Sequence, residues 1–318
     1  MNENTVKIKL LEADKLVITT LVDNYIDNFL ASTEHVQRPS LMKDGVRRKP
    51  LLAEHGLSFF IEVFEGEEHH SIIMDFGISP NAMPNNIAAM GVDMAQAEAA
   101  FLSHGHHDHI GALREVLGSL PHPIEVYLHP LALSQNRLHV FPDGREIAIP
   151  TLQRETIDQS GCPIIEIIEP HLLASGLIGT LTGIPRKTAF EKGMRTAHYK
   201  IDGKITKDDI LDDQGLVVNI KGKGLVVIAG CGHAGIINTI NFARQITGVE
   251  KIYAVVGGFH LTGPEFEPII DITVESMKHY SPEVIIPGHC TGWRAINLFE
   301  KTFPDQLAIN SVGTKIVL

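Results

Sequence analysis

Residues 104–109, His-Gly-His-His-Asp-His, gather four imidazoles and one carboxylate within six positions. They follow an apolar segment at 99–103 that is typical of a short buried strand. They precede a segment at 110–120 whose apolar residues have helical spacing. Imidazole nitrogens and carboxylate oxygens are ligands that Zn²⁺, Fe and Mn accept. Because a solvated loop gains nothing from so many histidines, the cluster predicts a metal site.

The order of these residues predicts which side chains face the metal. His104 and His106 are two positions apart in an extended segment, so their side chains point the same way. Asp108 and His109 would project from the first turn of the following helix toward the same space. His107 falls on the opposite side of the extended segment and is the expected bystander. The cluster thus offers two sets of ligands, which suit two ions.

Further candidate ligands occur where apolar, strand-like segments end. These residues are Asp75, Cys231, His233, His260 and His289. The ends of strands at one edge of a sheet are where α/β folds place their sites. We therefore expect these side chains to approach the 104–109 cluster.

Length and composition fit one globular domain. The chain has 318 residues, of which 44% are hydrophobic and 20% charged, and no linker or compositional break divides it. We expect hairpins at 56–77 and across the turn at 221–224, and helices at 82–90, 110–120, 236–246 and 265–280. The region at about 131–200 has no clear period and is expected to be an insertion-like part of the domain 1–318.

Charge and segment composition exclude several classes of protein. The formal net charge of −11 would repel a phosphate backbone, so we expect no nucleic-acid partner. No apolar run approaches the roughly 18 residues that span a bilayer, and the N-terminal stretch lacks the apolar core of a signal peptide. The three cysteines are far apart, which favours a reducing cytoplasm over a disulfide framework. The sequence indicates no oligomeric state.

The pattern His104-x-His106-x-Asp108-His109 resembles the signature motif of the metallo-β-lactamase superfamily. The segments "MDFG" (74–77), "GCGHAG" (230–235) and "PGHCTG" (287–292) are similar to other motifs of that family. The resemblance extends over nearly the whole chain and implies an α/β fold, a four-layer αββα sandwich in a single domain. It further implies that Asp75 braces the metal loops without touching an ion. The implied ligands are His104, His106 and His233 for the first ion, and Asp108, His109 and His289 for the second.

A narrower resemblance involves "LSHGHHDHIGAL" (102–113), "GCGHAGIINT" (230–239), "VVGGFHL" (255–261), "IIPGHCTG" (285–292) and "GIPRKTAFEKG" (183–193). These segments are similar to a cytoplasmic subgroup whose members are named metal-dependent hydrolases or dihydropterin–ribofuranosylaminobenzene-phosphate synthases. The resemblance implies two divalent ions per chain, Zn first and Mn or Fe otherwise, with metal-bound hydroxide as the nucleophile. It implies a hydrolase, or a synthase-like transferase, that acts on a small anionic phosphate or ester metabolite related to the pterin phosphates. Asp108 and His260 would be its catalytic residues.

The roles of four residues stay open at this point. Most superfamily members bridge the two ions with an Asp where this chain has Cys231. The Cys231 thiolate would bridge the ions or bind one of them, or it is a buried bystander. His260 would be a ligand, an oxyanion stabiliser or a proton donor, or else a hydrogen-bonded loop residue. Arg186 and Lys187 would bind a phosphate or carboxylate of the substrate, or else they are solvated loop charges.

Two alternatives to this function belong to other classes. One is a metal-binding or ligand-sensing protein without turnover. The other is a dinuclear-iron oxidoreductase, which the lack of a flavodoxin-like segment disfavours.

Overall fold

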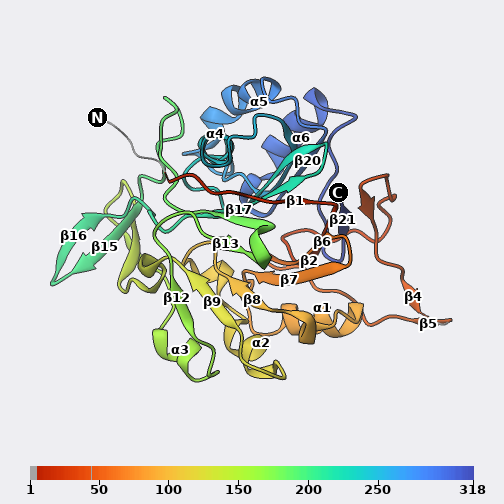
Figure 1. The fold of residues 1–318 in the computed structure, drawn as a ribbon. Helices are drawn as coiled ribbons and strands as arrows, with labels where there is room; N and C mark the ends of the chain where they lie inside the picture. Colours follow the sequence, from red (N-terminus) through yellow and green to blue (C-terminus); the bar gives the residue numbers. More distant parts are fainter. Residues whose placement is uncertain (1–5, 44) are drawn as a thin grey trace.

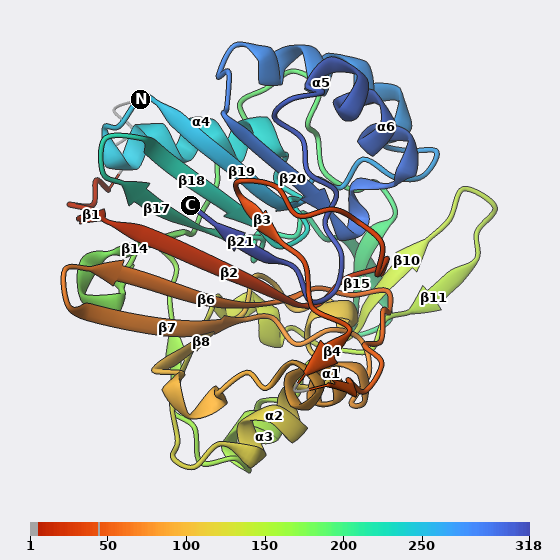
Figure 2. The same ribbon diagram turned by 90° about the vertical axis from the view of Figure 1, so that its right-hand side faces the viewer.

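The computed structural model describes residues 6–43 and 45–318, which form four layers. Two mixed sheets pack face to face, and helices cover the outer face of each sheet (Figures 1 and 2). This arrangement is the single-domain αββα sandwich that the motifs around residues 74–77 and 104–109 imply. The expected fold class is confirmed.

The first sheet has eight strands in the order β12-β9-β8-β7-β6-β2-β21-β3. Its strands are β2 (Lys15–Val22), β3 (Val36–Gln37), β6 (Ser58–Glu65), β7 (Glu68–Met74), β8 (Ala99–Phe101), β9 (Glu125–Leu128), β12 (Ile164–Glu166) and β21 (Lys315–Val317). Strands β6 and β7 form the hairpin expected at 56–77. Because β7 and β8 are parallel neighbours, Asp75 and the 104–109 cluster leave the sheet at the same edge.

The second sheet has the order β13-β14-β17-β18-β19-β20, with β1 also paired to β17. Its strands are β1 (Glu12–Ala13), β13 (Leu172–Leu173), β14 (Ile178–Leu181), β17 (Gly215–Ile220), β18 (Gly224–Ala229), β19 (Ile252–Gly258) and β20 (Val284–Gly288). Strands β17 and β18 are the antiparallel hairpin expected across 221–224. Strands β18, β19 and β20 are parallel, so the loops that follow them also share one edge.

Helices α1 (Ala82–Met90), α2 (Leu113–Ser119) and α3 (Arg154–Asp158) cover the first sheet, and α4 (Ile236–Thr247), α5 (Ile270–Lys278) and α6 (Trp293–Thr302) cover the second (Figure 1). Helix α5 is shorter than the helix expected at 265–280, since a 3₁₀ turn at Glu267–Ile269 precedes it. Pro268 in that turn has no N–H to donate to an α-helical ladder. Among the described residues, we find no helix with the length and apolar character that a membrane crossing requires.

The side-chain alternation of the strands explains the layers. In β18, Val226 and Ile228 pack in the core between the sheets, whereas Leu225 and Val227 pack in the core beneath the α4–α6 layer. Both faces of this strand are therefore buried, which is why 224–229 reads as a continuous apolar run.

Region 131–200 is divided between the sandwich and a separate sheet. Strands β10 (Arg137–Val140), β11 (Glu146–Ala148), β15 (Ala197–Ile201) and β16 (Lys204–Lys207) form an antiparallel sheet that projects from the sandwich (Figures 1 and 2). Strands β12 to β14 and helix α3, in contrast, belong to the two sandwich layers. The expectation of one insertion-like unit at 131–200 therefore needs correction. The periodicity was unclear because the region contains short strands of three different sheets.

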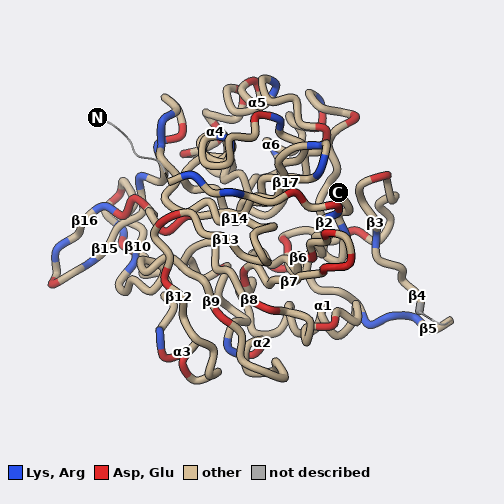
Figure 3. Tube along the Cα trace, in the orientation of Figure 1, with Lys and Arg blue, Asp and Glu red and all other residues tan. Residues whose placement is uncertain are grey.

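Charged residues of both signs are interspersed over the fold (Figure 3). A short basic run at 47–49 begins in β5 (Val46–Arg47), which forms a small hairpin with β4 (Met42–Lys43).

Candidate metal centre

The ends of parallel strands bring the candidate ligands together. The 104–109 segment follows β8, Cys231 and His233 follow β18, and His289 follows β20. The register pairs Ala229 with Gly257 and Gly258 with Gly288, so β18, β19 and β20 end side by side. Of the residues that the structure describes, these side chains form two clusters with metal-ligand spacing.

The first cluster consists of His104, His106 and His233, whose ligand atoms lie within 4.8 Å of one another. The Nε2 atom of His233 lies 3.1 Å from Nδ1 of His106. Nδ1 of His104 lies 3.0 Å from Oγ of Ser103, which leaves Nε2 of His104 buried without a hydrogen-bond partner. A buried imidazole nitrogen without a partner is costly unless an ion binds it. The three side chains fit one metal ion.

Burial keeps this histidine cluster uncharged. It lowers the pKa of His106 to about 3, with the nearby Arg137 guanidinium as the next cause. Burial also lowers the pKa values of His104 and His233 well below the usual range. At neutral pH all three are therefore neutral imidazoles, the form that coordinates metals.

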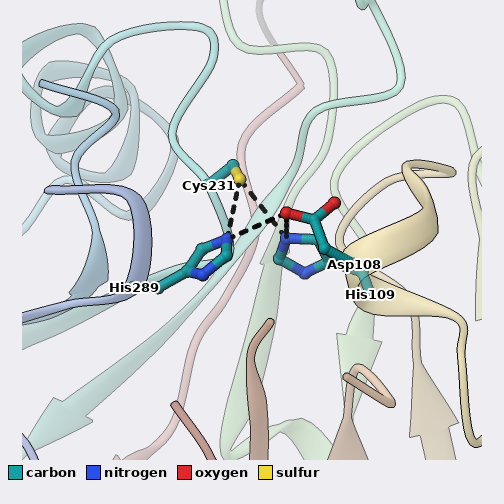
Figure 4. Close-up of side chains that lie close together, drawn as sticks. All are labelled: Asp108, His109, Cys231 and His289. Atoms are coloured by element: carbon teal, nitrogen blue, oxygen red, sulfur yellow. Dashed lines mark hydrogen bonds and ion pairs between the residues drawn. The ribbon is translucent and has the colours of Figure 1, made fainter. Parts of the chain in front are cut away.

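The second cluster consists of Asp108, His109, Cys231 and His289, which point toward one another (Figure 4). Sγ of Cys231 lies 3.3 Å from Nε2 of His109 and 3.3 Å from Nε2 of His289. Oδ2 of Asp108 lies 3.3 Å from Nε2 of His289 and 3.9 Å from Nε2 of His109. Ligand atoms of a tetrahedral zinc site lie roughly 3.3–3.7 Å apart, given metal–ligand distances of about 2.0–2.3 Å. Three of the four distances lie in this range and the fourth is slightly longer, so the four donors are close enough together to hold one ion.

The buried carboxylate of Asp75 and the side-chain amide of Asn24 hold the rings of this second cluster. Oδ2 of Asp75 lies 2.6 Å from Nδ1 of His109, so Nε2 of His109 faces the other donors. Asp75 also accepts hydrogen bonds from the backbone N–H and the hydroxyl of Ser103, both at 2.7 Å. Oδ1 of Asn24 lies 3.1 Å from Nδ1 of His289. The contacts of Asp75 with His109 and Ser103 correspond to the bracing role that the resemblance implies for Asp75.

The charges of this cluster are set by mutual attraction. Burial would lower the pKa of His289, but the neighbouring Cys290 and Asp108 raise it to about 9. Burial would raise the pKa of Asp108, but His109 and His289 hold it well below its usual range. A divalent cation would replace the proton on His289 while keeping Asp108 ionised.

Cys231 and His260 link the two clusters. Cys231 belongs to the second cluster and also to a group with His233 and His260. The rings of His233 and His260 lie 4.1 Å apart, and Nδ1 of His260 is buried without a hydrogen-bond partner. The backbone of His260 has a φ of 45°, in the left-handed region that few non-glycine residues adopt. The structure therefore holds His260 beside the first cluster at a cost in backbone strain.

His107 belongs to neither cluster, as expected for the bystander of the 104–109 segment. It lines the cavity at the ligand clusters, which has a volume of about 160 Å³. Glycine at position 105 allows a close approach of two backbone segments. An added Cβ at Gly105 would lie 2.2 Å from the carbonyl oxygen of Ala132, so glycine allows the metal loop to pack on the backbone of the next segment.

Arg186 and Lys187 do not line the cavity at the ligand clusters, so substrate binding by these two residues stays a prediction. Nη2 of Arg186 donates to the carbonyl of His233 at 3.4 Å, and the backbone N–H of Lys187 donates to the Asn238 side chain at 2.9 Å. Both residues belong to segment 183–193, which covers the N-terminus of α4. There Glu191 accepts hydrogen bonds from the N–H groups of Ile237 and Asn238 at 2.8 and 2.9 Å. A carboxylate of the chain itself thus satisfies this helix end.

Sequence reasoning missed a polar segment, Asp212-Asp213-Gln214, that holds the first ligand cluster. Asp212 accepts from the N–H of Gly105 at 2.9 Å, and Asp213 accepts from the N–H of Ala234 at 2.8 Å. Gln214 donates from its side chain to the carbonyl of Leu102 at 2.9 Å. The signal that could have found them is topological. Because β17 is antiparallel to β18, residues before β17 lie where β18 ends.

Arg137 of β10 extends this network to the projecting sheet. Its buried guanidinium donates from Nη2 to Asp212 at 2.6 Å, and Nε lies 3.2 Å from Asp208. Asp212 therefore contacts both the metal loop and the first residue of β10.

These sites and this fold are those of a known superfamily. The family model of the metallo-β-lactamase superfamily matches residues 53–238, more than half of the chain. The chain belongs to the metallo-β-lactamase superfamily.

Two relatives come from Methanocaldococcus jannaschii. The chain is 30% identical over 263 residues to 7,8-dihydropterin-6-methyl-4-(β-D-ribofuranosyl)-aminobenzene-5'-phosphate synthase, covering 81% of this chain and 87% of the relative. It is 29% identical over 258 residues to an uncharacterised protein, covering 80% of this chain and 91% of that protein. The crystal structure of Tm1679, a metal-dependent hydrolase of the β-lactamase superfamily, is similar with a TM-score of 0.70 and 24% identity. The match covers 95% of this chain and 98% of that one.

Proposed function

We propose that this protein is a dinuclear metal-dependent enzyme acting on a phosphate or ester group of a small anionic metabolite. The observation that supports the proposal is the meeting of two ligand clusters at one edge of the sandwich, three neutral histidines beside an Asp-His-Cys-His set. When bound, two such ions lower the pKa of coordinated water and stabilise negative charge that develops on oxygen.

We assign Cys231 as a ligand of the second ion. Its sulfur lies at ligand spacing from both histidines of that cluster, and imidazole with thiolate favours zinc over Mn or Mg. Zinc is therefore the expected metal in both positions.

The remaining polar groups would orient the ligands and the substrate. Asp75 fixes the ring of His109, and Asp108 supplies the carboxylate of the second cluster. The unpartnered Nδ1 of His260 is available to hydrogen-bond an oxyanion or a leaving group. His260 and Asp108 are thus the proposed catalytic residues. The substrate is expected in the cytoplasm, with no nucleic acid or membrane as partner.

Hydrolysis and group transfer differ in whether an oxygen atom of water enters the product. The relative named as a dihydropterin–aminobenzene-phosphate synthase favours a synthase-like transfer on a pterin phosphate. An experiment in ¹⁸O-labelled water separates the two, because hydrolysis places the label in the product and transfer does not.

The first test is turnover by zinc-loaded protein on chromogenic phosphomonoesters, phosphodiesters and carboxylic esters. Asp108→Asn should lower turnover by more than about 100-fold while the circular dichroism spectrum stays unchanged. His122→Ala, at an exposed histidine outside both clusters, is the matched control and should keep full activity. Two bound ions without turnover across the panel would favour a ligand-sensing protein instead. Bound iron with redox activity would favour the oxidoreductase.

A further inference from the structure

His55 lies beside the second ligand cluster without being one of its four donors. Its Nε2 atom lies 3.7 Å from Oδ2 of Asp108, and its ring centroid lies 5.3 Å from that of His289. The side chain is 59% exposed and lines the cavity at the ligand clusters. Because 3.7 Å is too long for a hydrogen bond, Nε2 of His55 is not bonded to the Asp108 carboxylate.

The pairing of two strands brings Asn24 to His55. Strands β2 and β6 are antiparallel, with Val22 at the end of β2 opposite Ser58 at the start of β6. Asn24 therefore leaves the sheet where His55 enters it. This edge of the first sheet is also the one that His289 of the second sheet approaches, because the Asn24 side chain contacts both histidines.

The Asn24 side chain makes four hydrogen bonds. Its Oδ1 accepts from the backbone N–H of Gly56 and pairs with Nδ1 of His289, both at 3.1 Å. Its Nδ2 donates to the backbone carbonyl of His289 at 3.2 Å and pairs with Nδ1 of His55 at 3.1 Å. An amide offers two N–H bonds and an oxygen with two lone pairs, so Asn24 uses its full capacity here.

Two backbone groups decide which end of the Asn24 amide is the oxygen. The N–H of Gly56 can only donate, and the carbonyl of His289 can only accept. A reversed amide would place oxygen against oxygen and N–H against N–H, and both bonds would be lost. The orientation of this amide is therefore fixed without reference to either imidazole ring.

The fixed amide sets opposite hydrogen positions on the two rings. Its Oδ1 can only accept, so Nδ1 of His289 carries a hydrogen and Nε2 is the nitrogen left for a metal ion. Its Nδ2 can only donate, so Nδ1 of His55 carries no hydrogen and Nε2 carries it instead. One side chain thus makes His289 a ligand and His55 a hydrogen-bond donor beside the same cluster.

We propose that His55 is a substrate-binding residue whose Nε2–H donates a hydrogen bond to an oxyanion held at the second cluster. Asn24 is the positioning residue that fixes this hydrogen. The inference rests on the proposed function for the presence of the oxyanion, and it assigns to that site two residues outside the metal-binding motifs. Hydrogen bonds to a charged oxygen are roughly twice as strong as those between neutral groups, so the donor has a measurable effect.

The first test determines the hydrogen position by long-range ¹H–¹⁵N NMR of the histidine rings in zinc-loaded protein at neutral pH. The signals of His55 are those that disappear in His55→Phe. In the wild type, Nε2 of His55 should be protonated and Nδ1 unprotonated. Asn24→Asp offers Nδ1 of His55 only an acceptor, so Nδ1 should become protonated in that variant. A protonated Nδ1 in the wild type, or an unprotonated one in Asn24→Asp, would overturn the proposal.

The second test measures the affinity of zinc-loaded protein for methylphosphonate, a non-hydrolysable oxyanion, by isothermal titration calorimetry. His55→Phe keeps a ring but removes the donor, and should lower this affinity about tenfold or more at unchanged zinc content. His55→Gln keeps an N–H group and should recover part of the loss. His122→Phe, at an exposed histidine outside both clusters, is the matched control and should bind like the wild type.

The outcomes separate this inference from the proposed reaction. Wild-type affinity in His55→Phe, or no methylphosphonate binding by wild-type protein that holds its zinc, would overturn the donor role. Loss of zinc from His55→Phe would also overturn it, because His55 would then support the ligands rather than the oxyanion. An affinity that depends on His55, without turnover of any substrate, would overturn the proposed reaction and leave the donor role in place.

Discussion

At the scale of single residues, the proposed ligand Cys231 would decide how a second ion is held. Its sulfur lies 3.3 Å from Nε2 of His109 and 3.3 Å from Nε2 of His289. The other acceptor in the cluster is the Asp108 carboxylate, which lies 3.3 Å from Nε2 of His289. Burial raises the pKa of the Cys231 thiol, and a zinc ion bound between the two imidazoles would offset this by stabilising the thiolate.

Replacing Cys231 with Ser should lower the affinity for the second ion by more than about 100-fold. Even the loss of a residue that only hydrogen-bonds to a ligand lowers metal affinity roughly 10–100-fold. The measurement is cobalt substitution, because a thiolate ligand gives a charge-transfer absorption in the near ultraviolet. We expect this absorption in the wild type and its loss in Cys231→Ser.

Cys290→Ala is the control for that experiment. Cys290 lines the cavity at the ligand clusters, as Cys231 does, but its Sγ donates to the backbone carbonyl of Cys231 at 3.2 Å. The absorption should survive this change. An absorption that disappears only in Cys290→Ala would show that the wrong thiol has been assigned.

At the scale of elements, the segment before β17 sets the loops that carry the first ligand cluster. Asp213→Ala should leave the N–H of Ala234 without an acceptor and lower the affinity of the first ion by about tenfold or more. Asp213→Asn keeps an acceptor oxygen and should restore most of that affinity. Competition titration with a chromogenic chelator measures both, and equal losses in the two variants would contradict a hydrogen-bonding role.

The Glu191 carboxylate, rather than a bound ligand, accepts hydrogen bonds from the first N–H groups of helix α4. Glu191→Ala removes the acceptor of two N-terminal N–H groups and should cost about 2 kcal/mol of unfolding free energy. Urea unfolding measures this loss. Glu300→Ala, at an exposed position of α6, is the control and should change stability by less than about 0.5 kcal/mol. An unchanged stability in Glu191→Ala would mean that solvent replaces the cap.

The sequence predicted the elements whose patterns are local. The β6–β7 and β17–β18 hairpins, α1, α4 and the 104–109 cluster all follow from periodicity, turn residues and spacing within one segment. Glu191 and Asp213 could not be predicted in this way. Their partners are 46 and 21 positions away, and only the sheet topology brings them together.

At the scale of the whole molecule, the metal loops connect the two halves of the sandwich. The first sheet supplies His104, His106, Asp108 and His109, and the second supplies Cys231, His233 and His289. Ions bound here would join the two layers, so binding energy becomes folding energy.

Removal of metal should therefore lower the stability of the entire domain. We expect zinc-loaded protein to melt cooperatively and at a higher temperature than chelator-treated protein. The free energy of unfolding should rise by about 4 kcal/mol when free zinc is roughly 1,000 times its dissociation constant. Differential scanning calorimetry with and without chelator measures the shift. Identical melting curves would show that the clusters bind no ion in the folded state.

Two ions, one in each ligand cluster, are the basis of the proposed function. Anomalous X-ray scattering at the zinc absorption edge, on crystals of the zinc-loaded protein, locates them. We expect two peaks, one among His104, His106 and His233 and one among Asp108, His109, Cys231 and His289. A single peak, or peaks away from these side chains, would contradict this expectation.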